Sequence, residues 1–156
     1  MRILCIASGG GHLEQMLACA EALAGHDLVL AHYAFRNFRG FRDPRFRGHV
    51  GVCRGGEGGW RLLAGTAISL FQWAWILLAL RPRAIFSTGA ELAVIPFWLG
   101  KLLLGARCAY LETFSRQDMP SRTGPLVYPV CDAFFVQSPA LLRHYGAKAR
   151  YEGRLM

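Results

Sequence analysis

Short apolar runs alternate along this chain with segments whose apolar residues recur at helical spacing. The runs, each too short for a helix, predict buried strands at 2–7, 27–33, 84–87, 107–111, 133–136 and near 149–152. Helical spacing predicts helices at 13–25, 62–80, 92–104 and 141–145. Strands that alternate with helices imply a parallel sheet with right-handed crossovers. We therefore expect an α/β fold, a Rossmann-like doubly wound parallel sheet.

Polar residues gather directly after the predicted strands. They are Ser8 to His12 after the first strand, Thr88, Gly89 and Glu91 after 84–87, Glu112 to Arg116 after 107–111, and Gln137 after 133–136. In a doubly wound sheet, ligands bind at the carboxyl ends of the strands, which share one edge. The pattern therefore predicts that these residues converge on one rim.

The segment Ser8-Gly9-Gly10-Gly11-His12 lies between the first strand and the first helix. Glycines let a backbone approach a ligand closely, and free N–H groups at a helix start favour phosphate or pyrophosphate. The third glycine of a dinucleotide fingerprint is replaced by Glu14, and Gly-Lys-Ser/Thr of a P-loop is absent. The alternative is a tight turn that only joins strand to helix.

His12 is either a general base or a hydrogen-bond donor to a phosphate oxygen. No carboxylate adjoins it closely enough in sequence to orient it, so Glu91 or Glu112 from another loop is the expected partner, and both are further candidates for the base. Glu112 and Arg116 face a ligand or form a local ion pair, which is worth little at a surface.

The 19 residues from Leu62 to Leu80 carry no charge. By length alone they are a transmembrane candidate. A crossing here would put strands of one sheet on opposite sides of a bilayer, so a helix that packs partly on the sheet and partly in the lipid interface is favoured. An ordinary buried helix is the third alternative.

The segment before this helix is strongly basic. Phe35 to Arg61 holds seven arginines against Asp43 and Glu57, which is +5 of the formal +8. At about 25 residues without a clear period, residues 35–60 are expected to be functional or mobile. Arginines mixed with phenylalanines suit single-stranded nucleic acid as well as anionic lipid. Because the segment leads into an apolar helix, we expect a membrane surface and no nucleic acid.

The size of the chain sets a limit on its function. Its 156 residues suit one domain, residues 1–156, but are few for a complete two-substrate enzyme of the doubly wound kind, so a missing half is expected. The composition is 53% hydrophobic with a mean hydropathy of +0.25. The five cysteines have no CxxC spacing, which gives no support for a metal site.

Six motifs resemble, in the same order, those of a known family. They are Ser8 to His12, Ser87-Thr88-Gly89, Tyr110 to Arg116, Ser121-Arg122-Thr123-Gly124, Val136-Gln137-Ser138 and Tyr151-Glu152-Gly153. The chain resembles the Alg-fourteen type of glycosyltransferase subunit along nearly its whole length. This group includes the bacterial exopolysaccharide proteins called PssD or EpsE.

The resemblance implies the N-terminal, acceptor-side half of a split GT-B glycosyltransferase. That half is related to the N-terminal domain of the enzyme that adds N-acetylglucosamine to the undecaprenyl-linked peptidoglycan precursor. Such a subunit sits on the membrane and recruits a soluble Alg-thirteen-like or PssE-type partner, which binds most of the UDP-sugar. The family's glycine loop and histidine map onto Gly9 to His12, and its Glu-x-x-x-Arg motif maps onto Glu112 and Arg116. Eukaryotic members carry an N-terminal membrane anchor that this sequence lacks, so attachment is expected through residues 35–80.

We therefore predict a subunit that transfers a sugar, with inversion, from a UDP-sugar to a polyprenyl-diphosphate-linked acceptor at the cytoplasmic face of the inner membrane, active with its partner. No cofactor or metal is expected. The predicted catalytic residues are His12, Glu91 and Glu112; the predicted substrate and phosphate ligands are Ser8, Gly9, Gly10, Gly11, Thr88, Gly89, Arg116, Thr123, Gly124 and Gln137. The rivals are a non-catalytic membrane scaffold for a self-sufficient partner and a free-standing nucleotide-binding Rossmann protein.

Overall fold

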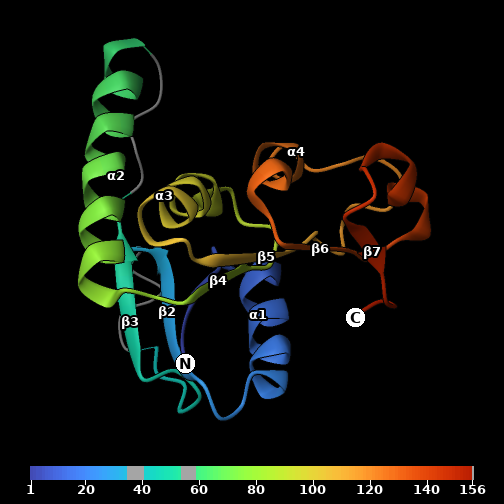
Figure 1. The fold of residues 1–156 in the computed structure, drawn as a ribbon, viewed down its shortest axis with the longest axis horizontal. Helices are drawn as coiled ribbons and strands as arrows, with labels where there is room; N and C mark the ends of the chain where they lie inside the picture. Colours follow the sequence, from blue (N-terminus) through green and yellow to red (C-terminus); the bar gives the residue numbers. More distant parts are fainter. Residues whose placement is uncertain (35–40, 54–58, 156) are drawn as a thin grey trace.

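The computed structural model describes residues 1–34, 41–53 and 59–155, of which the side chains of 59–63 are not considered. Its centre is a seven-stranded parallel sheet in the order β3-β2-β1-β4-β5-β6-β7 (Figure 1). The strands are β1 (Arg2–Ile6), β2 (Asp27–Tyr33), β3 (Gly48–Val52), β4 (Ala84–Ser87), β5 (Arg107–Leu111), β6 (Ala133–Val136) and β7 (Ala149–Tyr151). The order reverses between β1 and β4, so the predicted doubly wound Rossmann-like fold is confirmed.

Helices cover both faces of this sheet unequally. α2 (Gly59–Leu80), α3 (Val94–Leu104) and α4 (Gly124–Val127) lie on one face, and α1 (Gly11–Ala22) lies on the other (Figure 1). Short 3-10 turns complete the chain at η2 (Glu91–Ala93), η3 (Tyr128–Val130) and η4 (Pro139–His144). The last of these replaces the helix expected at 141–145.

β1 is apolar from Ile3 to Ile6 because both of its faces are buried there. Leu4 and Ile6 pack in the core that also contains residues of α2 and α3. Ile3 and Cys5 pack with Met16 of α1 in the core on the opposite face. A strand covered on both faces has no polar alternation, which explains why continuous apolar runs marked the central strands.

β3 is the strand that the sequence pattern did not predict. It lies at the edge of the sheet, paired only with β2, and two of its five residues are glycines, Gly48 and Gly51. An edge strand diluted by glycines carries little apolar signal. Residues 35–40 and 54–58 of the basic segment lie outside the described residues, so the expected mobility of residues 35–60 stays a prediction.

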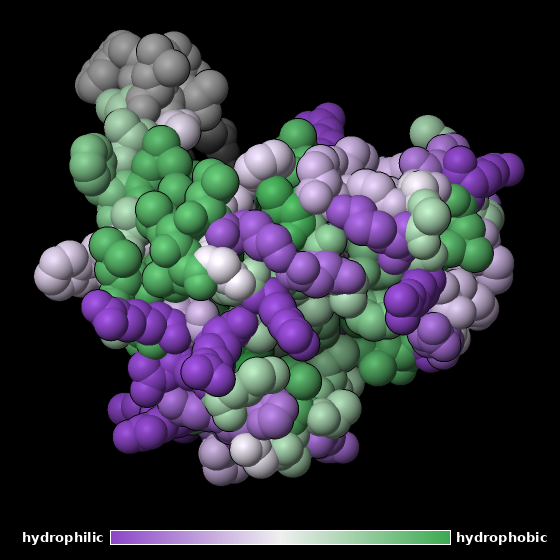
Figure 2. All heavy atoms as spheres, viewed as in Figure 1, coloured by the Kyte–Doolittle hydropathy of each residue, from purple (hydrophilic) through white to green (hydrophobic). Residues whose placement is uncertain are grey.

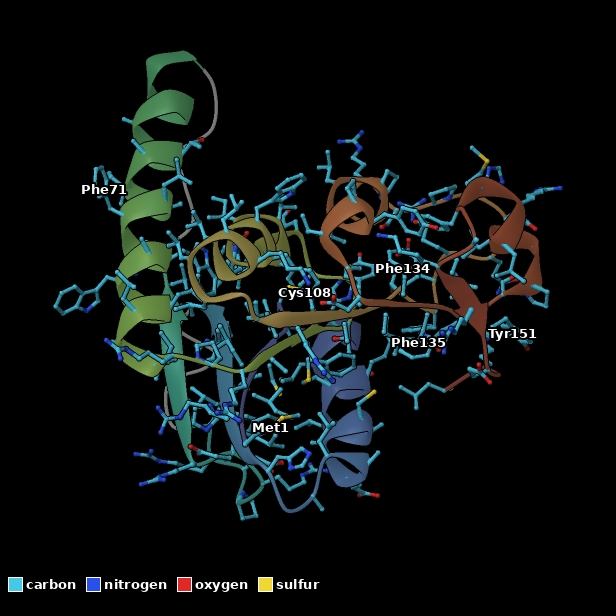
Figure 3. The ribbon with its side chains drawn as sticks, in the orientation of Figure 1. Met1, Phe71, Cys108, Phe134, Phe135 and Tyr151 are labelled. Atoms are coloured by element: carbon cyan, nitrogen blue, oxygen red, sulfur yellow. The ribbon has the colours of Figure 1, made fainter. Side chains whose placement is uncertain are left out.

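α2 buries one side and exposes the other. Trp73 and Leu77 are buried in the core, whereas Phe71 is 80% and Trp75 is 75% exposed. Phe71 projects from the helix away from the sheet (Figure 3). Among the helices within the described ranges, none is both long and apolar enough to cross a membrane.

Two adjacent leucines allow a test of whether only one side of α2 is buried. Leu77 is 0% exposed and Leu78 is 51% exposed. We expect Leu77→Ala to lower the free energy of unfolding by about 2–5 kcal/mol, because it opens a cavity, and Leu78→Ala to change it by no more than about 0.5 kcal/mol. Urea unfolding followed by far-UV circular dichroism measures both, and equal losses would contradict the burial of only one side.

Candidate functional site

The candidate site lies at the carboxyl edge of the sheet, where the strand order reverses. The glycine loop follows β1, and the turn Thr88–Glu91 follows the neighbouring β4. His12 joins them: its Nδ1 is 2.6 Å from the backbone oxygen of Thr88, and the Thr88 hydroxyl donates to the backbone oxygen of His12 over 2.6 Å. Crevices at such reversal points are the usual ligand sites of doubly wound sheets.

A pocket of about 260 Å³ opens at this point. Its lining includes six residues that the sequence predicted, namely Ser8, His12, Gly89, Glu91, Arg116 and Thr123. Thr113, Ser115, Ser121 and Arg122 complete it. The expected convergence of residues that follow different strands is thus seen in the structure.

Glycines allow the loops to approach one another. Gly89 has φ +93°, and a Cβ there would lie 3.0 Å from both Cε1 of His12 and Cβ of Thr113. A Cβ on Gly11 would lie 3.0 Å from Cε1 of Phe114. A side chain at either position would push the pocket walls apart, so glycine here preserves a close fit.

The pocket is predominantly cationic. Arg116 and Arg122 both line it and are exposed, and α1 begins beside it. Glu91 is the only carboxylate among its lining residues, and Tyr33 donates to Glu91 Oε1 over 3.0 Å. Guanidinium groups together with a helix N-terminus favour a phosphate or diphosphate group.

Glu112 lies behind the pocket wall. Its side chain is fully buried and does not line the pocket. Oε1 accepts from the Thr113 N–H over 3.0 Å, while Oε2 accepts from the N–H and hydroxyl of Ser121, over 3.3 and 3.1 Å, and from Tyr145. The pKa of Tyr145 is raised, mainly because the side chain is buried and to a smaller extent because it donates a hydrogen bond to Glu112.

Two further predicted ligands belong to the surroundings of Glu112. Gly124 donates its N–H to the Ser121 hydroxyl, and a Cβ on it would overlap Tyr145 and the Glu112 carboxylate. Gln137 donates to the backbone oxygen of Glu112 over 2.8 Å and accepts from the Leu155 N–H. Neither lines the pocket, and no ion pair joins Glu112 to Arg116 in the structure. Glu112, Gly124 and Gln137 thus lie behind the pocket wall, where Glu112 has a structural set of hydrogen bonds; their contact with substrate stays a prediction.

Of the glycine loop and Thr88, likewise, only some residues line the pocket. Ser8 reaches the pocket, and Gly9 to Gly11 form the backbone between it and His12. Thr88 is 0% exposed and does not line the pocket, and its hydroxyl donates to the backbone oxygen of His12. Arg122 also lines the pocket but was not among the predicted site residues, although it stands inside the Ser-Arg-Thr-Gly motif that supplied Thr123 and Gly124.

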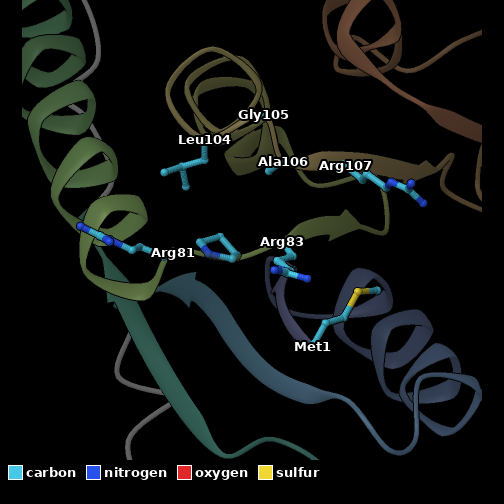
Figure 4. Close-up of a pocket in the computed structure, with 8 residues that line it drawn as sticks. Met1, Arg81, Arg83, Leu104, Gly105, Ala106 and Arg107 are labelled. Atoms are coloured by element: carbon cyan, nitrogen blue, oxygen red, sulfur yellow. The ribbon is translucent and has the colours of Figure 1, made fainter.

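A larger cavity, of about 450 Å³, lies at the opposite edge of the sheet. Arg81, Arg83 and Arg107 line it, near the ends of α2 and α3 (Figure 4). It contains none of the residues that gather after the strands. Among the described residues, no group of three or more His, Cys, Asp or Glu side chains could hold a metal ion.

The family model "Oligosaccharide biosynthesis protein Alg14 like" matches residues 62–155, which is more than half of the chain. The chain belongs to this family. It is 34% identical over 98 residues to the UDP-N-acetylglucosamine transferase subunit ALG14 of Eremothecium gossypii, covering 60% of this chain and 43% of that protein. The chain therefore spans less than half the length of this Alg14 relative.

Nearly all of this chain also superimposes on less than half of each of two longer proteins of known structure. MurG of Acinetobacter baumannii superimposes with a TM-score of 0.76 at 16% identity, over 96% of this chain and 45% of MurG. UDP-GlcNAc 2-epimerase of Methanocaldococcus jannaschii, solved with UDP-GlcNAc and UDP, superimposes with a TM-score of 0.71 at 17% identity, over 99% of this chain and 47% of the epimerase. These similarities establish a shared fold with slightly less than half of each chain.

The structural role of Glu112 predicts a loss of stability in Glu112→Gln. The glutamine amide replaces one acceptor oxygen by an NH₂ group. This NH₂ group must face the backbone N–H of Thr113 or that of Ser121, and an N–H cannot accept a hydrogen bond. We expect the free energy of unfolding to fall by about 1–3 kcal/mol, and by about 1 kcal/mol in Tyr145→Phe, which removes one donor. Denaturant titration measures both; unchanged stability in Glu112→Gln would contradict this role.

Proposed function

We propose that this chain is the membrane-associated, acceptor-side subunit of a two-component UDP-sugar glycosyltransferase that acts in polysaccharide biosynthesis. It binds a polyprenyl-diphosphate-linked acceptor and recruits an Alg-thirteen-like or PssE-type partner that binds the donor sugar. The proposed location is the cytoplasmic face of the inner membrane. Membership of the Alg14-like family and the cationic pocket at the reversal of strand order support this proposal.

The family relationship is the observation that carries the two-component proposal. The chain belongs to the Alg14-like family, and its Eremothecium gossypii relative is named a subunit of UDP-N-acetylglucosamine transferase. The superposition covers 96% of this chain and 45% of MurG, and a UDP-GlcNAc 2-epimerase shares the same fold. We infer that this chain, like the named subunit, acts together with a second subunit.

The pocket supplies groups for one side of such a reaction. Arg116, Arg122 and the start of α1 suit the acceptor diphosphate. His12 and Glu91 are the candidate bases, because both line the pocket and both can accept a proton from a hydroxyl. The departing UDP is assigned largely to the partner.

An apolar surface on α2 and α3 suits the membrane. Figure 2 shows apolar side chains gathered over α2. The exposed members on the two helices are Ile68, Leu70, Phe71, Trp75, Leu78, Trp98, Leu102 and Leu103. Contiguous exposed aromatic and aliphatic side chains mark interaction sites, and an interfacial helix carries such side chains on one face.

Basic residues border this apolar surface. Arg81 and Arg83 follow α2 directly, and Arg107 follows α3. The cavity that they line contains no acidic side chain. Basic groups beside an apolar surface are attracted to anionic head groups. We propose that the chain lies on the bilayer through α2 and α3, with these arginines at the level of the head groups.

Transfer of sugar to a polyprenyl-diphosphate acceptor by the chain together with its partner tests the proposed function. We expect His12→Ala to lower kcat by roughly 10²–10⁴-fold if His12 is the base. His26→Ala, an exposed histidine beyond the far end of α1, serves as the control and should retain wild-type turnover. Full activity of the partner alone on a soluble acceptor analogue would favour the scaffold alternative, and near wild-type turnover in His12→Ala would remove His12 from the chemistry.

Sedimentation with vesicles tests the proposed membrane surface. The double variant Phe71→Ser/Trp75→Ser should bind phosphatidylglycerol vesicles at least about tenfold more weakly than wild type, because burial of each aromatic side chain in an apolar phase is worth about 1.5–3 kcal/mol. Tyr151→Ser, an exposed aromatic on β7, is the matched control. Equal binding by the wild type and the double variant would refute this surface.

A further inference from the structure

The imidazole of His12 is held by the turn that follows β4. Its Nδ1 lies 2.6 Å from the backbone oxygen of Thr88, and the Thr88 hydroxyl donates to the backbone oxygen of His12 over the same distance. The two residues are 76 positions apart in sequence and are brought together by the neighbouring strands β1 and β4. The contact is therefore reciprocal, with one hydrogen bond in each direction.

The partner of Nδ1 decides which ring nitrogen carries the proton. A backbone oxygen can only accept a hydrogen bond, so Nδ1 must carry a hydrogen. In the neutral ring, Nε2 is then unprotonated and acts as an acceptor. Neutral histidine in water carries its proton mainly on Nε2, so the turn selects the less common tautomer.

The surroundings of the ring keep this arrangement in place. Thr88 is 0% exposed, so water does not compete for its hydroxyl. The ring edge at Cε1 faces Gly89, where a Cβ would lie only 3.0 Å away. His12 lines the pocket, and within the described part of the chain no hydrogen bond to its Nε2 is formed. Nε2 is thus the nitrogen left available to a substrate.

We propose that the Thr88–Gly89 turn is a positioning device that holds His12 in the Nδ1–H tautomer and so makes Nε2 a proton acceptor. The inference rests on the proposed function for the identity of the reaction. It separates the two roles considered for His12, because a neutral ring of this tautomer has no Nε2–H to donate to a phosphate oxygen.

The tautomer defines the transfer step on this side of the site. The acceptor hydroxyl oxygen forms a bond to the anomeric carbon of the donor sugar, and its proton passes to Nε2. The bond from that carbon to the UDP oxygen breaks, and its electron pair leaves with UDP. His12 becomes an imidazolium whose Nδ1–H still donates to Thr88. The same turn therefore holds the ring before and after proton transfer.

Nuclear magnetic resonance of the full chain labelled with ¹⁵N-histidine tests the tautomer without any substrate. The chain has five histidines, and the signals lost in His12→Gln identify residue 12. In two-bond ¹⁵N–¹H spectra at alkaline pH, we expect Nδ1 of wild-type His12 to be protonated and Nε2 to be unprotonated. A wild-type ring with its proton on Nε2 would overturn the proposal, and this measurement does not depend on the folding of any Thr88 variant.

Variants of the turn test the role of the hydroxyl. Thr88→Val removes it and should give a mixture of tautomers, whereas Thr88→Ser keeps it and should resemble wild type. Ser87→Ala is the matched control, because Ser87 precedes Thr88 in sequence and its buried hydroxyl has no hydrogen-bond partner among the described residues. A wild-type tautomer in Thr88→Val would contradict the positioning role of the side chain.

Activity with the partner connects the tautomer to chemistry. Thr88→Val should lower kcat by about tenfold or more with an unchanged KM for the donor sugar, and Thr88→Ser should restore kcat. The expected tautomer without any transfer would reject the proposed function alone, whereas transfer by a wild-type chain with the other tautomer would reject the positioning device alone.

Discussion

The parallel pairing of β1 with both β2 and β4 is the constraint on which the candidate site depends. The chain passes outward to one side of the sheet after β1 and to the other side after β4. The two loops leave neighbouring strand ends and lie within hydrogen-bonding distance, as the contact of His12 with Thr88 shows. Close approach requires a backbone without side chains, which Gly11 and Gly89 provide.

A second constraint comes from the buried side chain of Glu112. Removing a carboxylate from water is costly unless donors surround it. The chain meets this requirement with Thr113 and Ser121, which follow Glu112 closely in sequence, and with the distant Tyr145. This hydrogen-bonded group holds the segment 113–124, and that segment brings Arg116 and Arg122 to the pocket. Glu112 thus shapes the pocket without reaching it.

α2 connects the fold to the proposed membrane surface because one of its sides is buried in the core and the other is exposed. Its buried side, with Trp73 and Leu77, completes the core, so the helix cannot leave the sheet without exposing that core. Its exposed side, with Phe71 and Trp75, has no partner among the described residues. A helix of this kind attaches a folded domain to a surface while the pocket at the carboxyl edge keeps its geometry.

The fold could be predicted from sequence to a large extent, for a physical reason. The central strands are buried on both faces, so they appear as unbroken apolar runs, and a parallel sheet places every carboxyl end at one edge. β3 could not be predicted, because a glycine-containing edge strand loses the apolar pattern that burial imposes.

Sequence by itself determined which segments carry the polar residues of the rim. Only the tertiary structure decided which of these residues face the pocket. Glu91 and Glu112 are both carboxylates that follow strands, yet one lines the pocket and the other is fully buried. The difference arises from donors far away in the chain, such as Tyr145, and the choice between the nitrogens of His12 arises likewise from Thr88. Contacts between distant segments exist only once the sheet has formed, so local sequence carries no record of them.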